Sequence, residues 1–89
     1  MEIIILDCMK MTGREAMYDY IESGMRFPDY FGHNLDALND CLGELNHNVI
    51  VVLYNHEYLE KNMDNYGRKI LKIFMDASQE EYAFTLILK

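Results

Sequence analysis

Val49-Ile50-Val51-Val52-Leu53-Tyr54 is the longest apolar run of the chain, and it decides the fold. The run is rich in β-branched side chains and does not alternate with polar residues, which is typical of a strand buried inside a parallel sheet. Two shorter runs of the same kind lie at Ile3 to Leu6 and at Ala83 to Leu88. All three are far shorter than the about 20 apolar residues that a membrane-spanning helix needs. The sequence therefore predicts three buried parallel strands and no membrane span.

The segment between the first two runs has apolar residues at helical spacing. Thr12 and Glu15 match a capping box, so a helix is expected to follow them. Its apolar stripe is expected to comprise Ala16, Met17, Tyr20, Ile21 and Gly24. Phe27-Pro28-Asp29 then breaks the chain, and Asn34 is a good N-cap for a second helix that ends near Gly43. The residues expected on the buried face of this second helix are Leu35, Leu38, Cys41 and Leu42.

Two more helices are predicted between the second and third runs. Asn55 is expected to cap a short helix from His56 to about Met63, which Asn65-Tyr66-Gly67 interrupts. A last helix of roughly four turns then buries its apolar residues, Ile70, Leu71, Phe74 and Ala77.

This order of elements predicts an α/β fold with two layers. Crossovers between parallel strands are right-handed, so a sheet of order 1-2-3 places both pairs of helices on the same face. The other face is then thinly covered, and it is expected to include some of Ile4, Leu6, Thr85 and Ile87. A chain of 89 residues can form one core only, so residues 1–89 are expected to be a single domain.

The composition excludes several classes of partner. The chain has 15 acidic and 8 basic residues, a net charge of -7 at pH 7. Phosphate backbones and anionic membrane surfaces should repel such a domain, whereas a basic protein should attract it. The first residues lack the basic segment of a signal peptide, so we expect a cytoplasmic protein in which Cys8 and Cys41 are reduced thiols.

The negative charge is concentrated in the first half of the chain. Residues 1–45 carry a net charge of -6, and no Lys or Arg occurs between Arg26 and Lys61. Asp36 and Asp40 lie four residues apart on the second predicted helix, on the face opposite its leucines. Like charges at this spacing destabilise a helix by roughly 0.2–0.5 kcal/mol. The pair is either an ordinary solvated face or a surface that presents carboxylates to a cationic partner, and the nearby Tyr30 and Phe31 slightly favour the latter.

Catalysis and metal binding have weaker support. Asp36 and Asp40 could form an acid–base pair, but solvated carboxylates keep ordinary proton affinities. Cys41 could be a nucleophile, although its place on the apolar stripe favours a structural thiol. The three histidines are scattered and no Cys-x-x-Cys motif occurs, so neither a metal site nor a cofactor is expected.

The segment from Phe27 to Leu42 resembles the barstar family, intracellular inhibitors of barnase-like bacterial ribonucleases. The matching pattern is Pro-x-Tyr-aromatic-Gly-x-Asn-Leu-Asp-Ala-Leu-x-Asp-Cys-Leu, which fixes more than about ten positions at constant spacing. The length, the order of the elements and the closing strand Thr85-Leu86-Ile87-Leu88 are also similar, so the resemblance covers the whole chain.

The resemblance implies a barstar-like fold and a function, with no catalysis by the chain itself. Such inhibitors plug the active site of a basic ribonuclease, as an equimolar complex, with the second helix and the loop before it. Asp40 would then stand in for an RNA phosphate, and Asp36 would pair with a basic residue at the rim. Tyr30 would pack on the catalytic imidazole, and Asn34 and Leu35 would contact the substrate-recognition loops. The resemblance also assigns Gly32 and Asn39 to the interface, with Asp76 at its periphery. The free inhibitor would be a monomer.

Three positions depart from the family pattern. Asn39 and Leu45 stand where the archetype has tryptophans, and Asp76 replaces a glutamate. These differences leave a second hypothesis open, in which the same scaffold binds a different basic protein.

Overall fold

Three parallel strands form the sheet: β1 (Glu2–Asp7), β2 (Val49–Tyr54) and β3 (Thr85–Leu88). The computed structural model describes all 89 residues and places β2 between the other two strands. In the register, Ile4 lies opposite Val51, which in turn lies opposite Leu86. The predicted parallel sheet of order 1-2-3 is therefore confirmed, with the longest apolar run at its centre.

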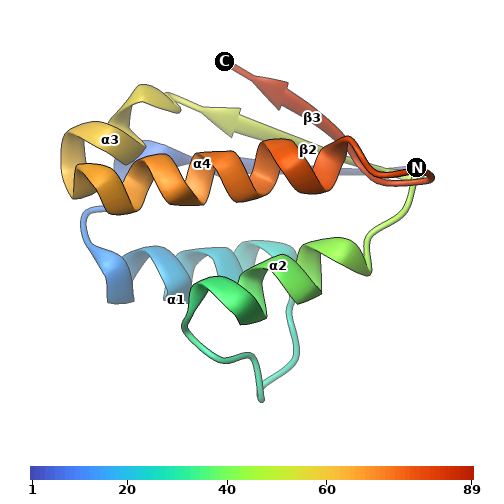
Figure 1. The fold of residues 1–89 in the computed structure, drawn as a ribbon, viewed down its shortest axis with the longest axis horizontal. Helices are drawn as coiled ribbons and strands as arrows, with labels where there is room; N and C mark the ends of the chain where they lie inside the picture. Colours follow the sequence, from blue (N-terminus) through green and yellow to red (C-terminus); the bar gives the residue numbers. More distant parts are fainter.

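Four α-helices connect the strands: α1 (Arg14–Met25), α2 (Leu35–Gly43), α3 (Glu57–Met63) and α4 (Asn65–Ser78). Figure 1 shows α1 and α2 side by side below α4, with α3 leading into α4. A short 3-10 helix, Cys8–Lys10, follows β1. The predicted α/β fold is confirmed, and no helix combines the length and the apolar character that crossing a bilayer would demand.

The two faces of the sheet differ in their cover. Ile4 and Leu6 face the helices and are buried with Val51 and Leu53. On the opposite face, Ile3 and Ile5 are 61% and 59% exposed, because adjacent residues of a strand point to opposite sides. A thinly covered face is thus present as predicted, and of the four candidate residues it includes Thr85 and Ile87, whereas Ile4 and Leu6 lie in the core.

The start of α1 differs from the prediction. Gly13 is its N-cap, with an extended backbone, and no side chain caps the helix. The predicted capping box of Thr12 and Glu15 is therefore absent, since Glu15 is bonded to His33 instead. The buried stripe is also displaced: Met17 and Ile21 are buried as expected, but the rest of it is Tyr18 and Met25, while Ala16 and Gly24 are exposed and Tyr20 is half-buried.

The junction of α3 and α4 corrects two further predictions. Asn55 does not cap α3 with its side chain; it donates a hydrogen bond to Asp7 instead. Asn65-Tyr66-Gly67 does not interrupt the helices but forms the first turn of α4, and the break is at Asp64, whose φ is 52°. A helical Gly67 suits this turn because its Cα lies directly against the backbone of Leu59 in α3.

Candidate protein-binding site

The loop between α1 and α2 presents one aromatic side chain to solvent and buries the next. The amide of Phe31 donates to the carbonyl of Pro28 at 2.8 Å, which closes a four-residue turn. Phe31 is buried against Phe27, with their ring centroids 5.1 Å apart. Tyr30 lies inside the turn and is 88% exposed. Phe31 therefore anchors the loop, and Tyr30 is free to contact another molecule.

Asn34 ends this loop and starts α2. Its side-chain oxygen accepts a hydrogen bond from the amide of Ala37 at 2.8 Å, which confirms the predicted N-cap. Gly32 leaves room for this cap, because a Cβ at that position would lie 2.9 Å from the side-chain nitrogen Nδ2 of Asn34. The first residue of α2, Leu35, is half-buried beside the cap. The three predicted contact residues Gly32, Asn34 and Leu35 are thus held at the helix N-terminus.

The outer face of α2 carries the unpaired acidic groups. Leu38 and Leu42 are buried, whereas Asp36 and Asp40 are exposed, as their spacing predicted. Neither carboxylate has a hydrogen-bond or ion-pair partner in the fold. Asp36 also lies in the first turn, where the helix dipole favours a negative charge. Two carboxylates are therefore displayed on one face with their charge uncompensated.

The cysteines are poor nucleophiles. Burial raises the pKa of the Cys41 thiol, and the charges of Glu44 and Asp40 raise it further. Burial likewise raises the pKa of Cys8 to about 12. Both residues are free thiols. Because the thiolate is the reactive species, a raised pKa makes Cys41 a weak candidate for a nucleophile.

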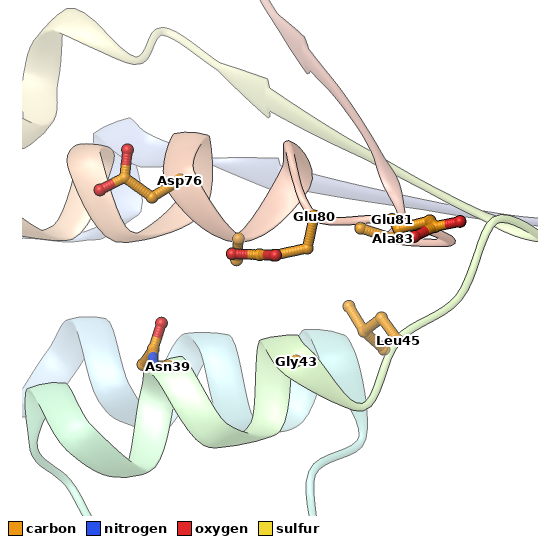
Figure 2. Close-up of a pocket in the computed structure, with 8 residues that line it drawn as sticks. Asn39, Gly43, Leu45, Asp76, Glu80, Glu81 and Ala83 are labelled. Atoms are coloured by element: carbon orange, nitrogen blue, oxygen red, sulfur yellow. The ribbon is translucent and has the colours of Figure 1, made fainter.

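A groove separates α2 from α4, and sequence reasoning found only part of it. Asn39 and Asp76 line it from opposite sides, so the structure brings these two predicted residues together. Figure 2 shows the side chains of Asn39 and Leu45 directed toward the groove. Two glutamates that the sequence did not single out, Glu80 and Glu81, also line it. The sequence gives no sign of their role, because only the packing of α2 beside α4 brings Glu80 and Glu81 close to Asn39.

Asp76 is the one predicted contact residue whose charge is already paired. The ammonium nitrogen of Lys72 lies 2.7 Å from its carboxylate oxygen, one helical turn away. In Figure 2 the carboxylate of Asp76 points away from α2. Its availability to a partner is therefore lower than that of the unpaired carboxylates on α2.

His33 is one of the three histidines that are scattered in the sequence, but in the structure it contacts three acidic residues of α1. Its ring nitrogens lie 3.2 Å from Glu15 and 2.9 Å from Glu22, with Asp19 at 3.9 Å. The only local signal was the spacing of the acids, which fall on one face of a helix. The ring therefore lies close to three carboxylates that all belong to α1.

Comparison with known proteins agrees with this architecture. The family model described as "Barstar (barnase inhibitor)" matches residues 1–89. A relative from Bacillus subtilis (strain 168), named "Putative ribonuclease inhibitor YrdF", is 35% identical over 81 residues, which cover 90% of this chain and 89% of the relative. The match spans both the sheet and the loop–α2 surface. The chain therefore belongs to the barstar family.

Proposed function

We propose that the protein inhibits a basic, barnase-like extracellular ribonuclease by covering its active site with α2 and the preceding loop. One inhibitor molecule binds one enzyme molecule, and the free inhibitor is a cytoplasmic monomer. The carboxylate of Asp40 occupies the position of an RNA phosphate and accepts hydrogen bonds from cationic side chains of the enzyme. Asp36 forms an ion pair at the rim, and Tyr30 packs on the catalytic imidazole.

The observation that carries this proposal is the unpaired acidic face of α2. A ribonuclease active site must bind a polyanion, so it presents cationic groups to whatever enters it. Asp36 and Asp40 offer charges of the opposite sign, and no cation of the chain competes for them. Tyr30 adds an exposed ring of the kind that is enriched where interfaces bind most strongly. Acidic residues and an aromatic anchor thus occur together on one short segment.

A different basic target is the alternative that specific residues favour. Asn39 and Leu45 are smaller than the tryptophans of the family archetype, and they border a groove rather than a filled surface. Asp76 has its charge paired with Lys72. A partner with a different contour beside its cationic site would therefore fit this groove better than the archetypal enzyme does.

An inhibition assay tests the proposal directly. With a barnase-like ribonuclease from the same source, we expect RNA cleavage to fall in proportion to added inhibitor and to stop at one equivalent. Cleavage is followed with a fluorogenic RNA substrate, and the complex is sized by light scattering. Undiminished cleavage at a large molar excess would reject the ribonuclease as the target and leave the alternative partner.

Salt is expected to slow the association of the complex. The Debye length falls from about 30 Å at 0.01 M salt to about 3 Å at 1 M, so long-range attraction between the acidic face and a basic enzyme is screened. We expect the association rate constant, measured by stopped flow, to fall by about tenfold or more over this range. The dissociation rate should change much less. Equal association rates at both salt concentrations would remove electrostatic steering from the proposal.

A further inference from the structure

His33 lies inside the binding loop, between the exposed Tyr30 and the helix cap Asn34. The other hydrogen bonds of this loop are local. The amide of Phe31 bonds to Pro28, and the amide of Asn34 bonds to Gly32. From Pro28 to Asn34, the only hydrogen bonds to an earlier element of the fold are those that His33 makes with α1. The position of the binding loop therefore depends on one polar side chain and on the burial of Phe31.

The geometry of His33 requires a charged ring. Nδ1 lies 3.2 Å from a carboxylate oxygen of Glu15, and Nε2 lies 2.9 Å from one of Glu22. A neutral imidazole has one N–H group, so it can donate to only one of these carboxylates and turns a lone pair toward the other. The imidazolium ion has two N–H groups and donates to both. Asp19, 3.9 Å from Nε2, adds a third negative charge nearby.

An aromatic surface fixes the plane of the ring. The imidazole stacks on Tyr18, with centroids 5.5 Å apart and planes 18° apart, and Phe31 lies 5.6 Å away. Tyr18 is buried, and its hydroxyl shares a hydrogen bond with that of Tyr66 in α4. Arg14 lies over the ring of Tyr66 and forms no ion pair with the acids of α1. His33 is thus the only cation paired with these carboxylates.

We propose that His33 is the positioning residue of the binding loop: as an imidazolium ion it ties the loop to α1, and loss of its proton loosens the loop and weakens capture of the target. A loosened loop populates the binding-competent arrangement of Tyr30 and Asn34 less often, and the apparent affinity falls by that fraction. The inference rests on the proposed function for its effect on binding, but the tie itself is a property of the free protein.

The direction of the pH dependence follows from the bonds of the ring. The hydrogen bonds with Glu22 and then with Glu15 raise the pKa of His33 above its usual value, and partial burial opposes them only weakly. A group whose pKa is raised by folding stabilises the folded state fully below its unfolded pKa of about 6.5. That stabilisation is lost as the pH rises through the higher pKa of the folded state. The loop should therefore be held at mildly acidic pH and released at alkaline pH.

The first arm of the experiment uses the free protein. NMR titration of wild type should give His33 a pKa above the ordinary histidine value of about 6.5. Hydrogen-exchange protection factors of the backbone amides of residues 29–34 should fall by about threefold to tenfold between about pH 6 and pH 9. His33→Gln should show the low protection at both pH values, and the matched control His47→Gln should behave as wild type. A His33 pKa at or below the ordinary histidine value of about 6.5, or equal protection in wild type and His33→Gln, overturns the proposal.

The second arm measures binding to the ribonuclease over the same pH range. Because the enzyme titrates too, the informative quantity is the ratio of the dissociation constants of His33→Gln and wild type at each pH. We expect this ratio of dissociation constants to be about 3 to 10 at pH 6 and about 1 at pH 9. A constant ratio overturns the link between the tie and binding. If neither wild type nor His33→Gln inhibits the enzyme while the loop responds to pH as expected, the proposed function fails. The hydrogen-bonded link between His33 and α1 then still stands.

Discussion

Asp40→Ala is expected to weaken inhibition of the target ribonuclease by about a hundredfold to several-thousandfold. In the proposed complex this carboxylate is buried against cationic side chains, so removal of one partner would leave the other charges desolvated and unpaired. Such a loss costs about 3–5 kcal/mol, and every 1.4 kcal/mol is about tenfold in the dissociation constant. The change is measured as the inhibition constant at fixed salt.

The free protein should tolerate the same change. Asp40 is exposed and has no partner in the fold, and its removal relieves the repulsion with Asp36. The unfolding midpoint in urea should therefore stay the same or rise slightly. Glu57→Ala, which also removes one exposed acid but from α3, is the matched control and should affect inhibition only weakly. Equal losses of inhibition in the two variants would mean that total charge, and not the position of Asp40, determines binding.

Gly67→Ala is expected to lower the free energy of unfolding by about 3 kcal/mol or more. A Cβ at this position would lie 1.8 Å from the carbonyl oxygen of Leu59 and 2.3 Å from its carbon. These are backbone atoms of α3, so no side-chain rotation relieves the clash, and α3 must move away from α4. Overpacking costs typically about 1–3 kcal/mol even where side chains can adjust. The intrinsic preference of helices for alanine returns only about 1 kcal/mol.

Gly43→Ala is the matched control for this substitution. Gly43 is also helical, as the last residue of α2, but a Cβ there would meet no atom within 4 Å. The control should therefore keep or gain stability, by up to about 1 kcal/mol. Urea unfolding followed by circular dichroism compares the two variants with wild type. Wild-type stability in Gly67→Ala would show that α3 and α4 do not pack as closely as described.

The architecture could be predicted because its signals are local and strong. Each strand is a continuous apolar run, and in a sheet of the simple order 1-2-3 right-handed crossovers place both helix pairs on the same face. The exposure of Asp36 and Asp40 also followed from local spacing, since Leu38 and Leu42 fix which side of α2 is buried. For these features, the sequence within one element was sufficient.

The errors arose where contacts between distant segments overrode local preferences. Asn65 and Gly67 have the composition of a break, but close approach to Leu59 makes glycine suitable inside the first turn of α4. Tyr18 replaced Ala16 in the stripe of α1 because it packs on Phe31 and bonds to Tyr66.

The candidate site could likewise be predicted only where its features lie within one segment of the chain. Its acidic helix face is visible in one segment, whereas the tie between His33 and Glu15 joins residues 18 positions apart. The groove requires α2 and α4 to be adjacent, which no local pattern indicates. Some residues of the site could therefore be predicted from the sequence, but the contacts that hold them together could not.

The exposed face of the sheet makes the net charge of the protein important for its solubility. Ile3 and Ile5 remain in contact with water, so two molecules would adhere through these surfaces if nothing kept them apart. At neutral pH the net charge of -7 makes copies repel one another, and this repulsion vanishes near the isoelectric point of about 4.7. Acidification therefore removes the electrostatic repulsion between copies, whereas the exposed isoleucines remain available for contact. The excess of acidic residues that we propose attracts a basic enzyme is thus also expected to keep copies of this protein apart.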